Sequence, residues 1–159
     1  MKRFIMLLLL PVLMITGCGN RLKEPVTFYY VNTGYDLDMS PAIGSEQRET
    51  SGHSGDLDYL MALYLMGPAS DELKSPIPKG ISILSTEHSN AGITLELSDT
   101  SRTMTDVQFT LACSCLTLTC FEITDAEFVT INSGDRSITL KADELLLQDL
   151  ITADTEENS

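Results

Sequence analysis

Basic residues are scarce in this 159-residue chain, which holds 10 lysines and arginines against 23 aspartates and glutamates. The formal net charge is −13 at pH 7. Nucleic acids and anionic lipid surfaces attract basic proteins and repel acidic ones. The composition therefore argues against both as direct partners. It fits a domain kept soluble by its charge, or one that binds a basic partner.

Catalytic signatures are also missing. The chain has two histidines, His53 and His88, and both lie in polar, turn-rich segments. A hydrolase built on either would need an activated nucleophile and an orienting acid, and no G-x-S-x-G elbow is present. We interpret residues 51–54 as a loop. We expect no catalytic residues and predict that the protein is not an enzyme.

A membrane-spanning run of about 20 apolar residues is absent as well. The longest apolar run, residues 4–16, is about 13 residues long, follows Lys2 and Arg3, and ends in Ile15-Thr16-Gly17-Cys18. This pattern resembles a secretory signal. Small residues before a cysteine suit lipoprotein processing, because they fit a narrow peptidase site and the thiol can accept a diacylglyceryl chain. We predict a signal peptide over residues 1–17, cleavage between Gly17 and Cys18, and lipid attachment at Cys18.

The predicted lipid indicates where the protein is located. Two or three acyl chains on Cys18 give stable anchoring, at about 0.8 kcal/mol per buried methylene. We therefore expect a lipid-anchored protein on the extracytoplasmic face of the cell membrane, with no cofactor apart from this covalent lipid. The mature chain keeps 8 basic and 23 acidic residues, a net charge of −15.

The remaining cysteines do not form a disulfide framework. Cys113, Cys115 and Cys120 are an odd set in an exported protein, so at least one is unpaired. A zinc site needs four ligands, and on a helix this C-x-C-x4-C spacing does not direct three thiols to one point. We expect no Cys113–Cys120 disulfide on a helix, because seven residues rise about 10 Å and the usual Cα separation in a disulfide is below about 7 Å. We predict that these thiols fill the core and hold no metal, with a redox or metal role as the alternative.

Four aspartates raise the question of a calcium-binding site. Asp36, Asp38, Asp56 and Asp58 are closely spaced, but they lack the glycine-centred loop and the closing glutamate of a calcium-binding hand. Asp56 and Asp58 suit the positive end of a helix that begins after Asp56.

Apolar patterning predicts alternating strands and helices. A helix follows Asp56, with Leu57, Leu60, Met61, Tyr64 and Leu65 at helical spacing, and ends at Gly67-Pro68. Because Leu63 and Met66 are also apolar, we expect this helix to be buried on more than one side, with a partner-binding face as the alternative. The pattern over residues 103–121 fits a strand or a helix, although its length favours a helix. Strands are predicted over residues 26–31, 45–50, 81–86, 92–97, 127–132 and 136–141, and a short closing helix over residues 143–150.

The chain is organised as one domain with polar ends. Residues 18–24 are expected to form a lipidated tether, residues 25–150 a single domain, and residues 151–159 a disordered acidic tail.

An ordered set of motifs covers nearly all of residues 26–141 and resembles the GerM (GerMN) domain of sporulation and spore-germination proteins. The motifs are Phe28-Tyr29-Tyr30, Arg48, Leu65-Met66-Gly67-Pro68, Leu73-x-Ser75-x-Ile77-Pro78-x-Gly80, residues 92–98, Thr117-Leu118-Thr119 and Val129-x-Ile131-x-x-Gly134. The chain departs from the family in having one copy of the domain, where the family's lipoproteins carry tandem copies, and in Glu96, where aspartate is usual.

The resemblance implies a two-layer α+β sandwich with the order ββαββαββ, in which a mixed sheet carries two helices on one face. It is related to the ring-building modules of spore-forming bacteria, and it implies that residues 103–121 are helical. Such domains act by contacting other envelope proteins, so the implied partners are envelope proteins or further copies of this chain.

Two functions remain open from the sequence. The first is a membrane-tethered protein-interaction module in sporulation, germination or envelope assembly. The second is a binder of a small ligand or cell-wall fragment, with Tyr29, Tyr30 and Tyr64 as stacking platforms, together with Tyr35 and Tyr59. An exposed apolar patch or free strand edge would favour the first function, and a closed pocket lined by tyrosines would favour the second.

Overall fold

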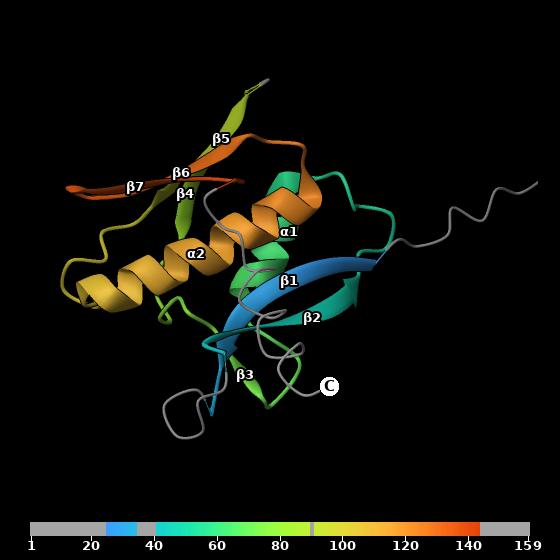
Figure 1. Ribbon diagram of the computed structural model, residues 1–159, viewed down its shortest axis with the longest axis horizontal. Coiled ribbons are helices and arrows are strands. Elements are labelled where there is room, and N and C mark those ends of the chain that lie inside the picture. Colours follow the sequence, from blue (N-terminus) through green and yellow to red (C-terminus); the bar gives the residue numbers. More distant parts are fainter. Residues whose placement is uncertain (1–24, 35–40, 90, 144–159) are drawn as a thin grey trace, which may run out of the picture.

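The structure is a computed structural model that describes residues 25–34, 41–89 and 91–143. It has an α+β fold with seven strands and two helices in the described residues. In chain order these are β1 (Pro25–Asn32), β2 (Ile43–Glu49), α1 (Leu57–Leu65), β3 (Leu73–Lys74), β4 (Ile83–His88), β5 (Gly92–Leu97), α2 (Asp106–Ile123), β6 (Phe128–Ser133) and β7 (Arg136–Lys141) (Figure 1).

The strands form two sheets. One has the order β2-β1-β3 and is antiparallel throughout. The other has the order β4-β5-β6-β7 and is mixed, because β5 and β6 run parallel while the outer pairs are antiparallel. A parallel pair needs a long crossover connection, and α2 supplies it between β5 and β6.

Helix α2 lies between the two sheets, where it contacts β1 on one side and β6 and β7 on the other (Figure 1). A capping box fixes its start: the Thr105 side chain accepts from the Gln108 backbone N–H, and the Gln108 side chain accepts from the Thr105 backbone N–H. Its buried side chains are mostly small: Phe109, Ala112, Cys113, Cys115, Leu116, Thr117, Thr119 and Cys120. Although α2 is long and apolar enough to span a bilayer, its place between the sheets makes it a core helix.

Two aromatic side chains form the centre of the core between β1 and α1. Tyr30 and Tyr64 are fully buried and stack with ring centroids 4.8 Å apart. The Tyr30 hydroxyl donates to the Tyr64 carbonyl at 3.3 Å, and the Tyr64 hydroxyl donates to the Tyr29 carbonyl at 3.0 Å. The predicted role of Tyr30 and Tyr64 as stacking platforms is therefore wrong, because neither ring reaches the surface.

The α+β class and the predicted order of elements are confirmed, with β3 as an additional two-residue strand. Residues 103–121 fall largely within a helix, as the family resemblance implied. Two details differ from expectation. The strands are divided between two sheets, and α1 buries mainly one face, formed by Leu60, Met61 and Tyr64, while Met66 beyond its end is 79% exposed.

Several predictions concern residues outside those that the structure describes. They are the signal peptide with its Gly17–Cys18 cleavage site, the lipid on Cys18, the tether over residues 18–24, most of the closing helix over residues 143–150, the tail over residues 151–159, and Tyr35, Asp36 and Asp38.

The buried thiols predict a loss of stability at alkaline pH. Burial raises the pKa of Cys113, Cys115 and Cys120 from 9.0 to about 12. Between about pH 9 and pH 12 the unfolded chain has released these protons while the folded chain keeps them, so the free energy of unfolding falls as pH rises through this window. Urea denaturation followed by circular dichroism at pH 7 to 11 should show this fall.

Cys120→Ala tests the cause of this pH dependence. The substitution should make the fall shallower, by at most about 1.4 kcal/mol per pH unit. Ser114→Ala in the same helix is the control and should leave the slope unchanged. An equal slope in the Cys120→Ala variant would contradict the assignment to this thiol.

Candidate functional site: an apolar surface on α1

Two large apolar side chains are exposed near α1, one in the edge strand β4 and one at the end of the helix. Leu84 in β4 is 64% exposed, and Met66 at the end of α1 is 79% exposed. Between the helix and the strand lies an open hollow of about 360 Å³, which we call the α1–β4 groove. It is lined by Asp58, Met61, Ala62, Leu65, Ile83, Leu84, Ser85 and Thr86. A protein that is 43% hydrophobic buries most such side chains, so a cluster left at the surface indicates a contact area.

A β-bulge explains the exposure of Leu84. The pairing with β5 shifts between Ile83 and Ser85, so that two steps along β4 match one step along β5. The additional residue, Leu84, leaves the alternation of inward and outward side chains. The adjacent apolar residues Ile83 and Leu84 are the sequence signal for this break.

The β4 strand also offers unpaired backbone groups. It is the first strand of its sheet, so its outer edge pairs with no strand among the described residues. The Ser89 N–H donates to the Gly92 carbonyl, which sets the alternation of hydrogen-bonded pairs along the hairpin. The backbone groups of Thr86 and His88 therefore point away from β5. Such an edge can accept an extended segment of another chain.

A second, larger hollow adjoins the first. It has a volume of about 530 Å³ and lies between the end of α1 and the loop after β3. We call it the α1–loop groove; it is lined by residues 65–68, 70–71, 73–75 and 77–81. Leu65 lines both hollows, so the two grooves form one surface along α1.

Charged side chains of β2 hold the end of α1 in place. The Arg48 guanidinium donates to the Leu63 carbonyl at 3.3 Å and to the Gly67 carbonyl at 3.1 Å. The Glu46 carboxylate accepts from the backbone N–H groups of Ala69 and Ser70 at 3.0 and 3.1 Å. Because residues two apart in a strand share a face, Glu46 and Arg48 reach the same turn.

Local turn chemistry completes the α1–loop groove. Gly67 has a φ of +85°, which a residue with a side chain rarely adopts and which ends the helix. In the loop, the Ser75 hydroxyl accepts from the Ile77 N–H and donates to the Ile77 carbonyl. Gly80, with a φ of +97°, turns the chain back toward β4. The residues of the family resemblance at 65–68 and 75–80 thus shape this groove.

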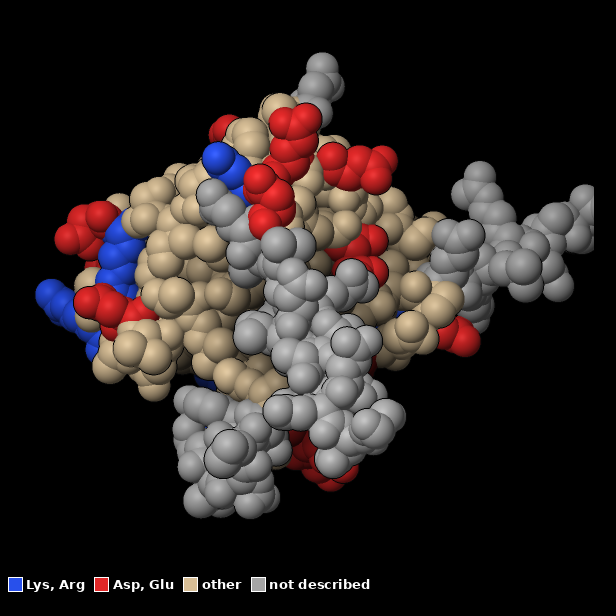
Figure 2. Space-filling model, viewed as in Figure 1, with Lys and Arg blue, Asp and Glu red and all other residues tan. Residues whose placement is uncertain are grey.

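The charges on this surface are separated. Asp58, in the first turn of α1, lines the α1–β4 groove, whereas Lys74 and Lys79 line the α1–loop groove together with Asp71. Figure 2 shows carboxylates at many places on the visible face of the protein and basic side chains at few.

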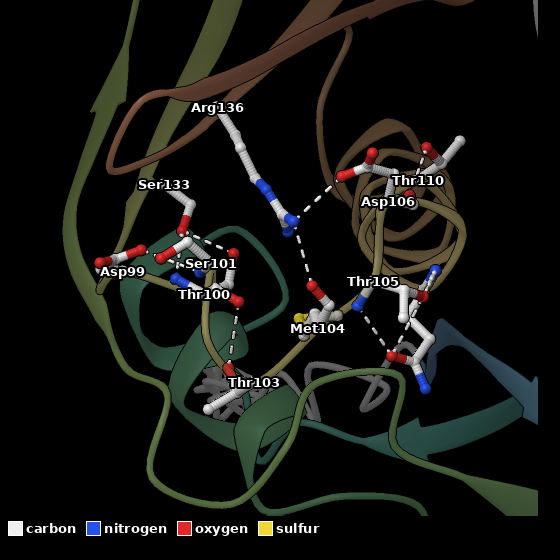
Figure 3. Close-up of polar contacts among 11 residues, drawn as sticks. Asp99, Thr100, Ser101, Thr103, Met104, Thr105, Asp106, Thr110, Ser133 and Arg136 are labelled. Atoms are coloured by element: carbon white, nitrogen blue, oxygen red, sulfur yellow. Dashed lines mark hydrogen bonds and ion pairs between the residues drawn. The ribbon is translucent and has the colours of Figure 1, made fainter.

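A polar network at the start of α2 is structural (Figure 3). Arg136 donates to the Met104 carbonyl and to the Asp106 carboxylate, both at 3.0 Å, and its guanidinium lies 5.1 Å from the Phe109 ring centroid. Thr100 and Ser133 are buried and share a hydrogen bond of 2.8 Å. The contacts of this network connect the β6–β7 hairpin to the helix.

The remaining predicted site residues are dispersed. The Tyr29 hydroxyl donates to the Glu122 carboxylate at 3.1 Å, which ties this partly buried ring to α2. Tyr59 stacks on His53 at 4.5 Å. Asp56 caps α1 by accepting from the Tyr59 N–H at 3.1 Å, as predicted. The three cysteines are buried free thiols, and in the described part of the chain no three histidine, cysteine, aspartate or glutamate side chains form a metal-binding group.

Sequence reasoning missed three residues of this surface. Leu84 lies in the strand predicted over residues 81–86, but the pattern does not show that its side chain is exposed. No role is assigned to Glu46 or Lys79 from the sequence. A signal for Glu46 was its position two residues before Arg48, because two opposite charges on one face of a strand suggest a shared target.

Comparisons with known proteins add two structural likenesses. No family model matches the chain, and no curated protein matches it. The tandem GerMN domains of the sporulation protein GerM from Bacillus subtilis align with a TM-score of 0.48 and 16% identity, over 71% of this chain and 39% of that one. A Clostridium perfringens protein assigned provisionally as a lipoprotein aligns with a TM-score of 0.47 and 17% identity, over 77% of this chain and 91% of that one.

Removal of the Arg48 guanidinium should destabilise the protein and make the turn after α1 more mobile. Arg48→Met keeps an apolar stem but removes the charged donor from the Gly67 carbonyl and leaves the Leu63 carbonyl with only the Met66 N–H, at a cost of about 1.5 to 3 kcal/mol in the free energy of unfolding. Amide exchange at Gly67 and Ala69 should accelerate. Arg102→Met, at an exposed arginine, is the matched control and should change stability by less than about 0.5 kcal/mol. Equal effects of the two substitutions in urea denaturation would refute the role of Arg48.

Proposed function

We propose that this protein is an extracytoplasmic lipoprotein whose single domain docks onto other proteins of the cell envelope. The observation that carries the proposal is the exposed apolar surface along α1, which adjoins the edge of β4 that pairs with no other described strand. Apolar residues beside a free strand edge suit a protein partner, since the edge supplies backbone hydrogen bonds and the groove accepts side chains.

Membrane attachment through Cys18 sets where docking takes place. The sequence Ile15-Thr16-Gly17-Cys18 supports lipid attachment. A tether of residues 18–24 spans at most about 25 Å, at about 3.6 Å per residue. The partner is therefore a protein within reach of the membrane surface, or a second copy of this chain. The resemblance of the sequence to GerMN domains favours sporulation, germination or envelope assembly as the setting.

The open shape of the surface favours protein docking over the alternative, binding of a small ligand or cell-wall fragment. Small-molecule sites bury most of the ligand surface in a concave, largely apolar pocket. Both grooves are open, and two of the tyrosines considered as stacking platforms, Tyr30 and Tyr64, are inside the core. The proposed function involves no catalysis, no cofactor other than the lipid, and no nucleic acid.

The anchor is tested by Cys18→Ala. The substituted precursor should not incorporate radiolabelled palmitate and should be lost from the membrane fraction, because no other thiol lies at the processing site. Cys120→Ala is the matched control and should still be lipidated. Acylation of the Cys18→Ala protein would remove the basis for the anchor.

The docking surface is tested by site-specific crosslinking in cells. A photoreactive phenylalanine analogue at Leu84 or Met66 should yield a discrete crosslinked species with an envelope protein, because both side chains are exposed and each lines one of the grooves. The same analogue at Val107, which is 77% exposed at the start of α2, is the control and should yield none. Equal crosslinking from all three positions would show that the α1 surface has no special role.

A further inference from the structure

The outer side of α2 carries no charge over most of its length. From residue 107 to residue 121 the helix has no aspartate, glutamate, lysine or arginine. Val107, Leu111, Ser114 and Leu118 follow one another at spacings of four, three and four residues, so they form one line along the helix. A helix that is apolar on all sides is normally covered on all sides.

The described residues cover this line of side chains incompletely. Val107 is 77% exposed, and Leu111, Ser114 and Leu118 are partly exposed. The partly buried apolar side chains that pack against the core include Phe121 of the same helix, but neither Leu111 nor Leu118. The other sides of α2 contact β1, β6 and β7. In the described part of the chain, the side that carries Leu111 and Leu118 is therefore left outside the core.

The sequence after β7 has an apolar face of matching length. A short closing helix is predicted over residues 143–150, most of which lie outside the described residues. On a helix, at about 100° per residue, four apolar residues of this segment fall within about 140° of one another: Leu146, Leu147, Leu150 and Ile151. Three polar residues fall on the opposite side: Glu144, Gln148 and Asp149. A helix over residues 144–151 is about 12 Å long, and Leu111 and Leu118 are about 10 Å apart along α2.

The chain leaves β7 near the C-terminal end of α2. Directly after β7, the Ala142 N–H donates to the Glu127 carbonyl at 3.2 Å. Glu127 follows Ile123, the last residue of α2, by four positions, which span at most about 14 Å. Leu118 lies five residues before Ile123, about 7.5 Å along the helix. Residues 144–151 therefore begin near Leu118 and are able to run back along α2.

We propose that residues 144–151 form an amphipathic helix that packs antiparallel to α2 and covers its outer side. Leu146 contacts Leu118, and Ile151 reaches toward Leu111. A segment of the same chain is favoured over a separate molecule, because its attachment to β7 gives it a high effective concentration at this face. This closure is independent of the proposed docking function, which uses the surface along α1.

Photo-crosslinking of the purified full-length protein tests the proposal. A photoreactive phenylalanine analogue at Leu118 should crosslink within one chain to residues 144–151. Trypsin cleaves after lysine and arginine, so mass spectrometry should identify a joined pair of peptides that cover residues 103–136 and 142–159. The same analogue at Leu84 in β4 is the control and should give no crosslink to residues 142–159.

Substitutions in the closing segment identify the contact. Leu146→Asp/Leu150→Asp places two charges on the apolar face and should abolish the crosslink from Leu118, because a buried charge without a partner is costly. In the protein without the analogue, the same double substitution should increase the hydroxyl-radical oxidation of Leu118. Thr152→Asp/Thr155→Asp adds the same charge beyond the apolar face and should change neither readout. Thermal unfolding of each variant establishes that it is folded.

Several results would overturn the proposal. A crosslink from Leu118 between two chains would assign this side of α2 to a second copy, and a crosslink from Leu84 to residues 142–159 would place the segment elsewhere. Absence of the crosslink from Leu118, or no change in crosslinking and oxidation in the Leu146→Asp/Leu150→Asp variant, would show that the segment does not cover α2. Crosslinks to envelope proteins in cells test the docking function separately.

Discussion

The structure depends on the contact between α2 and β1. The Thr119 hydroxyl accepts a hydrogen bond from the Tyr29 N–H at 3.0 Å and donates to the Cys115 carbonyl at 2.9 Å. β3 pairs only with Val31 and Asn32 at the end of β1. At Tyr29, the Thr119 hydroxyl therefore provides the acceptor that a neighbouring strand would otherwise provide. Such close approach requires small side chains on the helix, which explains the cysteines and threonines on its buried faces.

The position of β1 then determines that of α1 and the grooves. Tyr30 of β1 stacks on Tyr64 of α1, and the two hydroxyl groups bond to the backbone of the opposite element. Strand β2, paired to β1 in register, carries Glu46 and Arg48 to the turn that follows α1. Helix α1 is thus held by the contacts of its buried face with β1 and by the contacts of its C-terminal turn with β2. Among the described residues, Ala62 and Met66 on its outer side stay exposed.

Local patterns predicted most elements because alternation and helical spacing are local properties. Strands β1, β5, β6 and β7 follow the period of two, and Asp56 with Gly67 delimits α1. Helix α2 was ambiguous because burial between two sheets removes the polar face that marks a helix.

The division into two sheets and the location of the surface depend on non-local pairing. The sequence does not show that β3 joins β1, or that a bulge turns Leu84 outward. Tyr30 and Tyr64 are buried and stack on each other. The sequence alone is equally compatible with a buried tyrosine ring and with an exposed one. Apolar residues on α1 indicated a contact area, but the α1–loop groove also depends on residues 77–81, which the loop after β3 brings to the end of the helix.

Shallow open grooves suit a tethered protein. A free protein needs a large, well-packed interface to reach high affinity, because association costs translational and rotational freedom. When a lipid anchor holds the domain and its partner on one membrane, the effective concentration rises to about the millimolar range that short tethers give. A contact of modest affinity is then sufficient. Under these conditions an open apolar surface is able to supply the contact without a deep pocket.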